Sequence, residues 1–107
     1  MEKYEASVTI DGVKYELPEV STEQYLDYLD VREPIADRAL YTRKDFYAMA
    51  DALVSLYGNQ FTREQLLGTG GLKPGEVVVQ FSMVDSVLMN QVNDSVAEVK
   101  KNFTSGA

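Results

Sequence analysis

Side chains that could carry out catalysis are scarce in this sequence. The 107 residues include no histidine and no cysteine, seventeen aspartates and glutamates, ten lysines and arginines, and seven tyrosines. No imidazole is available to activate a serine or threonine, and no thiolate can attack a substrate or bind a metal. The composition therefore predicts a protein that is not an enzyme and that needs no cofactor.

Carboxylate pairs do occur at spacings that a metal ion could use. Asp27 and Asp30 lie three residues apart and Glu23 and Asp27 lie four apart, so each pair shares one side of a helix if this stretch is helical. Hard cations such as Ca²⁺ prefer carboxylate oxygens. These acids fall on the side of the helix that should face water, so a solvated surface explains them better than a metal site.

A glycine-rich stretch, "GTGGLKPGE" over residues 68–76, follows the middle of the chain. Glycine-rich loops can hold phosphate groups, but those loops place a lysine directly before a serine or threonine, and this pair is missing here. We expect residues 68–76 to be a connector between helices, with no bound nucleotide.

The charge balance restricts the kinds of partner. A formal net charge of −7 repels phosphate backbones and anionic lipid surfaces, which predicts no nucleic-acid binding and no membrane binding. An acidic surface can also imitate DNA, so a small inhibitor of a DNA-processing enzyme is an alternative function. The N-terminus lacks the basic and apolar regions of a signal peptide, so we expect the protein to stay in the cytoplasm.

The first twenty residues have the pattern of a β-hairpin. Apolar and polar residues alternate on both sides of Asp11-Gly12, the dipeptide that most strongly favours a tight hairpin turn. Pro18 then closes the second strand. Because an isolated hairpin is only marginally stable, residues 1–20 must lie on the helices or pair with another chain.

Residues 21–67 contain three helix starts of one kind. In each, a serine or threonine can cap the helix while a polar residue three positions later returns the bond: Ser21 with Gln24, Thr42 with Asp45, and Thr62 with Gln65. We expect Pro34 to end the first helix near Glu33, and residues 34–40 to form a short helix or an irregular arm. Gly58 should end the middle helix.

The last helix is predicted to be long. Pro74 suits a helix start, and apolar residues then recur every three, four or seven positions, describing a helix over 77–103 of roughly 28 residues and about 42 Å. This helix should overhang the core of a domain of this size, leaving residues 104–107 as a tail. The apolar positions are Val77, Phe81, Val84, Leu88, Val92, Val99 and Phe103. The predicted fold is mainly α, one domain over 1–107 with an N-terminal β-hairpin, a small helical domain and a long C-terminal helix.

A second apolar stripe runs along the same helix. Val79, Met83 and Val87 are spaced four residues apart and lie on a different side from Phe81. Either the helix is central and covered on all sides, or this stripe contacts another subunit or partner. The three residues are the candidate interface for self-association or partner binding.

The corner between the middle helices has the sequence "YGNQFT". Tyr57, Gly58, Asn59, Gln60, Phe61 and Thr62, together with the order of elements, resemble the tail assembly chaperones of long-tailed bacteriophages and related prophages. In that family a helix ends in a run of this type and a short helix follows. The glycine-rich connector at 68–76 departs from the family pattern.

The resemblance implies a role in building phage tails. Such chaperones bind and solubilise the tape-measure protein in the cytoplasm of the infected bacterial host, self-associate into rings or spirals, and are absent from the mature virion. In some relatives a longer, frameshifted form contacts the major tail tube protein. The alternative from another class is a structural tail or head-tail connector component, which would remain in the virion.

Overall fold

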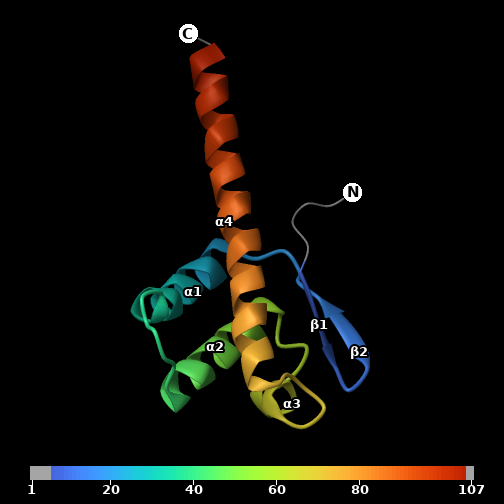
Figure 1. Ribbon diagram of the computed structural model, residues 1–107. Coiled ribbons are helices and arrows are strands. Elements are labelled where there is room, and N and C mark those ends of the chain that lie inside the picture. The colour runs from blue at the N-terminus through green and yellow to red at the C-terminus, as the bar shows by residue number, and fades with distance from the viewer. Residues whose placement is uncertain (1–5, 106–107) are drawn as a thin grey trace.

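The computed structural model describes residues 6–105, with side chains described for residues 6–100. Within this range the chain forms a two-stranded hairpin followed by four helices, which confirms the predicted mainly α fold (Figure 1). The predicted tail over 104–107 is wrong for its first two residues, because the last helix continues to Ser105. Residues 106–107 lie outside the described residues, and Phe103 lies outside the part for which side chains are described.

The hairpin consists of β1 (Ser7–Ile10) and β2 (Val13–Glu16), paired antiparallel with Ile10 opposite Val13. Asp11 and Gly12 have φ angles of 52° and 79°, the two left-handed conformations of a turn that matches the twist of the strands. Val8 and Ile10 point inward and are buried. The Asp-Gly turn is therefore confirmed.

The hairpin lies on the helices of its own chain. Gln80 donates from Nε2 to the Ser7 carbonyl at 3.1 Å, and the Asp11 amide donates to the Gly70 carbonyl at 2.8 Å. These bonds hold β1 against the last helix and the hairpin turn against the glycine-rich connector, and Figure 1 shows the hairpin beside both.

The first helix, α1 (Thr22–Ile35), begins with the predicted capping box and ends later than predicted. The Gln24 amide donates to Ser21 Oγ at 3.1 Å, and the Ser21 amide donates to Gln24 Oε1 at 2.9 Å. Pro34 lies inside the last turn, so the predicted end near Glu33 is wrong. The proline removes one donor, but the Ala36 amide still bonds to the Arg32 carbonyl at 2.9 Å and buried Ile35 anchors the turn.

After α1, residues 36–42 form an irregular arm and not a second short helix, the other alternative for this stretch.

The next helix, α2 (Arg43–Leu56), begins at the predicted Thr42 and Asp45 box, with Asp45 N donating to Thr42 Oγ1 at 3.1 Å. The short helix α3 (Arg63–Leu67) begins at the third predicted box, at Thr62 and Gln65. Between them, Gly58 turns the chain with a φ angle of 76°, confirming its role as the residue that ends the helix.

The last helix, α4 (Pro74–Ser105), starts within the last residues of the predicted 68–76 connector. The Lys73 amide donates to Glu76 Oε1 at 2.8 Å, which satisfies a free donor at the helix start. One half of α4 packs on the other elements around a core that includes Leu53, Leu66 and Val84. The other half extends away from the body of the domain, whose overall dimensions are 56 × 30 × 21 Å (Figure 1).

Candidate interaction surface

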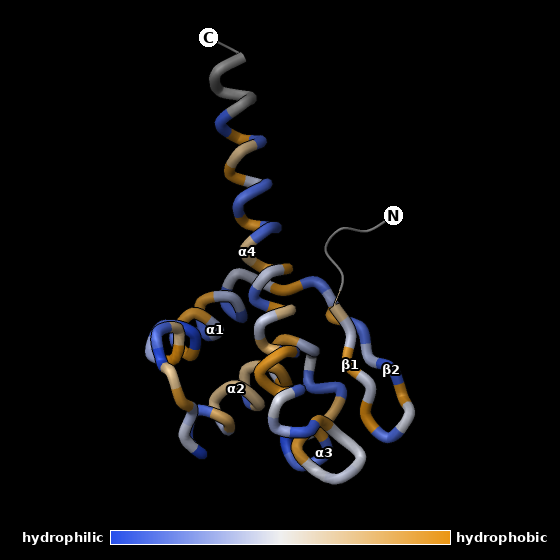
Figure 2. Tube along the Cα trace, in the orientation of Figure 1, coloured by the Kyte–Doolittle hydropathy of each residue, from blue (hydrophilic) through white to orange (hydrophobic). Residues whose placement is uncertain are grey.

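The projecting half of α4 carries apolar side chains that contact little. From Asn90 to Lys100 every residue is exposed. Within this stretch Val92, Val96 and Val99 are 38%, 48% and 52% exposed, and we call these three residues the projecting strip. Their spacing of four and three residues places them on one side of the helix. Figure 2 shows apolar positions recurring between hydrophilic ones along this half of α4.

The projecting strip continues the side of α4 that is buried in the core. Phe81 and Val92 are eleven residues apart, and so are Leu88 and Val99. Eleven residues make about three turns of a helix and return to the same side within about 20°. The same apolar stripe is thus covered by the domain up to Leu88 and exposed beyond it.

The structure separates the three residues of the second predicted stripe. Val79 and Met83 are 59% and 43% exposed, whereas Val87 is 8% exposed and belongs to the core. Val87 therefore offers little surface to a partner. Val79 and Met83, which we call the exposed pair, are the part of the predicted interface that is accessible.

The corner over residues 57–62 has a structural role. Tyr57 and Phe61 are buried with their ring centroids 5.6 Å apart, and the Phe61 and Tyr15 rings pack edge-to-face with centroids 5.1 Å apart. Gly58 and Asn59 both have positive φ angles, and Gln60 Nε2 donates to the Tyr57 carbonyl at 2.7 Å. The corner therefore joins the helices to the hairpin.

Buried Tyr57 also reaches α4. Its hydroxyl donates to Gln80 Oε1 at 2.8 Å, and burial raises the pKa of the phenol to about 12. The spacing of residues in the sequence does not indicate this bond, because Tyr57 and Gln80 are brought together only by the packing of two helices.

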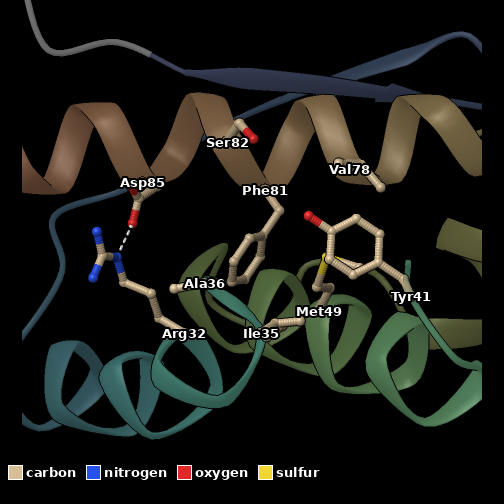
Figure 3. Close-up of a pocket in the computed structure, with 9 residues that line it drawn as sticks. All are labelled: Arg32, Ile35, Ala36, Tyr41, Met49, Val78, Phe81, Ser82 and Asp85. Carbon is tan, nitrogen blue, oxygen red and sulfur yellow. Dashed lines mark hydrogen bonds and ion pairs between the residues drawn. The ribbon is translucent and has the colours of Figure 1, made fainter. Parts of the chain in front are cut away.

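A cleft lies between α1, the arm over 36–42, and α4 (Figure 3). Arg32 Nε and Asp85 Oδ1 form an ion pair of 2.6 Å at one end, and the Tyr41 ring stands at the other. Phe81 points from α4 into the space between them. Burial raises the pKa of the Asp85 carboxyl, although Arg32 lies against one of its oxygens. The cleft measures about 200 Å³, below the roughly 300 Å³ at which ligand pockets begin, so it suits a side chain better than a cofactor.

The carboxylates whose spacing could suit a metal ion lie on the surface of α1. Glu23, Asp27 and Asp30 are all exposed. Across residues 6–105, no three acidic, histidine or cysteine side chains are grouped so that they could hold a metal ion. In the same part of the chain, no helix has both the length and the apolar content to span a bilayer.

An acidic helical domain with a long, partly uncovered helix suits a protein that binds other proteins. The family model described as phage tail chaperone protein matches residues 1–104, and the chain belongs to this family. No curated protein and no solved structure matches the chain. The membership confirms the resemblance seen in the residues around Tyr57, and it makes the chain a phage tail chaperone.

Proposed function

We propose that this tail chaperone binds and solubilises the tape-measure protein in the cytoplasm of the infected host, through the projecting strip of α4. One observation carries the proposal: Val92, Val96 and Val99 are exposed on a helix that extends beyond its own core. An apolar strip on one helix suits the apolar side of another amphipathic helix. A long helical tape-measure protein would present many such sides.

The size of the strip indicates how the binding would work. Covering the exposed half of a valine stabilises a complex by about 1 kcal/mol, so three valines contribute about 3 kcal/mol. That is weaker than the roughly 4 kcal/mol of a millimolar complex, before any entropic cost. A single copy would therefore hold its partner loosely, and useful affinity requires several linked copies.

Self-association supplies that linkage. We assign a subunit contact to the exposed pair, Val79 and Met83, which lie on the covered half of α4 but face away from the core. Copies joined there into a ring or spiral would present several projecting strips to one tape-measure chain. Each weak contact would remain reversible, which suits a chaperone that the tail tube must displace.

The test compares two substitutions at similarly exposed helical positions, Val96 at 48% and Leu26 at 53%. Val96→Asp places a charge within the strip, whereas Leu26→Asp places one on α1, where Leu26 is 53% exposed. We expect purified Val96→Asp to lose binding to tape-measure fragments and Leu26→Asp to retain it, as measured by co-sedimentation. Equal binding by both variants would contradict the proposed site.

The alternative function, a structural tail or head-tail connector component, differs in where the protein ends up. A chaperone is absent from finished particles and a component is present, so mass spectrometry of purified virions separates the two. A longer frameshifted form that contacts the major tail tube protein is also part of the proposal. Peptides spanning a frameshift junction in infected cells would demonstrate it.

A further inference from the structure

Among the described residues, the outer edge of β2 pairs with no other strand. The Leu17 amide donates to the Ala6 carbonyl at 2.9 Å, and Val8 lies opposite Tyr15. Since partners alternate along an antiparallel ladder, the residues at 13, 15 and 17 bond toward β1. The amide and carbonyl groups of Lys14 and Glu16 therefore point away from the hairpin. The other edge of the hairpin faces the rest of the domain: Ser7 of β1 accepts from Gln80 of α4, and Asp11 in the turn donates to Gly70 of the connector.

An open groove runs along this free edge. One protein group approaches the edge closely: Gln60 Nε2 lies 3.4 Å from the Glu16 carbonyl, a contact longer than its 2.7 Å bond to the Tyr57 carbonyl. The groove is lined by Lys14, Glu16, Pro18, Tyr57, Gly58 and Gln60. The corner over 57–62 thus forms one wall of a site with the shape and the backbone groups to take an extended strand.

We propose that the occupant of this groove is the β2 strand of a second copy of the chain, paired antiparallel about a two-fold axis at Tyr15. In this register Lys14 lies opposite Glu16 of the second copy, and Glu16 lies opposite its Lys14. Both residues point their backbone groups outward, so each such pair exchanges two hydrogen bonds. The two hairpins become one four-stranded sheet, and the weak Gln60 contact is replaced by a ladder bond.

Charge selects this register from its neighbours. Sliding the second strand by two residues keeps outward-pointing backbone groups facing each other, but it places Lys14 opposite Lys14 in one direction and Glu16 opposite Glu16 in the other. The second of these registers also places Pro18, which has no N–H, opposite Lys14. Like charges directly opposite each other destabilise a strand pair, and opposite charges stabilise it. Centring the pair on Tyr15 is the arrangement in which both charge pairs are complementary.

The apolar side of the strand fits the same register. Val13 is 51% exposed in the single chain, and it would lie opposite half-buried Leu17 of the second copy. Tyr15, half-buried against Phe61, would lie beside its own symmetry mate. Aromatic and aliphatic neighbours across a strand pair add stability, so the pairing covers an apolar side chain that the hairpin leaves exposed.

This contact deepens the self-association proposed above, and it uses a different surface from α4. A two-fold contact closes after two copies, so a ring or spiral needs a second, separate contact. The β2 edge and the exposed pair on α4 would together provide the two. The pairing itself concerns copies of the chain alone and does not depend on tape-measure binding.

Exchanging the two charges tests the register. Lys14→Glu leaves acids at both positions and Glu16→Lys leaves lysines at both, so each variant alone should repel itself and lose the pairing. Mixing the two single variants in equal amounts restores two complementary charge pairs, as does the double exchange K14E/E16K. Lys44→Glu, an exposed lysine on α2, is the control for the change in net charge.

The measurement is particle mass by sedimentation velocity, without tape-measure protein and at low ionic strength. The series is repeated on Met83→Asp, so that contacts through α4 do not hide the effect. We expect each single variant to weaken the pairing at least tenfold, and the mixture, the double exchange and Lys44→Glu to match the unsubstituted chain. Single variants that pair normally, or a mixture that stays unpaired, would overturn the proposal. If the unsubstituted chain itself does not pair, the proposal is also overturned. Lys14 and Glu16 would then be charges that protect the β2 edge from pairing.

Discussion

The hydroxyl of Tyr57 donates a 2.8 Å hydrogen bond to Oε1 of Gln80, and both side chains are buried. The other end of the Gln80 amide donates to the Ser7 carbonyl at 3.1 Å. One glutamine therefore connects the 57–62 corner, α4 and β1. Because buried polar groups are costly unless they are bonded, this chain of bonds fixes how α4 docks onto the rest of the domain.

Replacing Tyr57 with phenylalanine should destabilise the domain. The change keeps the ring but removes the donor to Gln80 Oε1, leaving a buried acceptor without its partner. We expect a loss of about 1 to 3 kcal/mol in the free energy of unfolding. Urea unfolding followed by circular dichroism measures it. A variant as stable as the unsubstituted chain would show that the bond contributes nothing to the fold.

The same replacement at Tyr28 should have the opposite outcome. Tyr28 is 1% exposed, and within residues 6–100 its hydroxyl has no hydrogen-bond partner. Removing a buried, unbonded hydroxyl relieves its desolvation cost, so Tyr28→Phe should leave stability unchanged or raise it by up to about 1 kcal/mol. The same urea experiment compares the two variants, which differ only in whether the lost hydroxyl was bonded. A loss as large as that of Tyr57→Phe would contradict the assignment.

Alkaline pH should weaken the fold through Tyr57. Burial raises the pKa of this phenol from its ordinary value of 10.0 to about 12, so the folded state holds the proton more tightly than the unfolded state. The resulting stability is complete below pH 10.0 and is lost as the pH rises toward about 12. Unfolding free energies measured across this range should fall less steeply in Tyr57→Phe. Identical slopes would show that another group controls the loss.

Local signals in the sequence predict most of the fold. The three capping boxes, the Asp-Gly turn and the left-handed Gly58 that follows α2 depend on residues within a few positions of one another, and all are present. The predicted end of α1 is wrong because packing outweighs the proline. Pro34 costs one backbone hydrogen bond, but Ile35 is buried against Met49 and Val77 from elsewhere in the chain and keeps the last turn helical. A local rule does not include that distant packing.

The exposed apolar surface of α4 is less predictable from sequence, because it also depends on distant packing. Spacing along α4 identifies which residues share a side of the helix, but it does not indicate how far along the helix the core extends. Val87 and Val96 look equally apolar in sequence, yet the domain covers the first and leaves the second exposed. The bond from Tyr57 to Gln80 and the open β2 edge likewise require the three-dimensional arrangement.

Aspartate substitutions at Met83 and Val87 should distinguish a surface position from a core position. Met83 is 43% exposed, so Met83→Asp should fold normally and weaken self-association through α4. Val87 is 8% exposed, and burying a carboxylate there should destabilise the domain by several kcal/mol. Light scattering and thermal unfolding measure the two effects. Unchanged association in Met83→Asp would remove the exposed pair from the interface, and unfolding of this variant would place Met83 in the core.

Truncating the projecting half of α4 should separate folding from function. A chain that ends at Asn93 keeps every helical residue that packs on the core and loses Val96 and Val99, both about half exposed. Residues 94–100 are exposed and lie outside the core, so stability should change by less than about 1 kcal/mol. The truncated chain should unfold at nearly the same urea concentration, pair normally through the β2 edge, and fail to bind tape-measure fragments.

Two other outcomes would contradict this prediction. Because the projecting strip is continuous with the core stripe, retained binding would place the tape-measure site on the covered half of α4, beside Val79 and Met83. A large loss of stability would mean that the projecting half supports the domain and is not reserved for a partner.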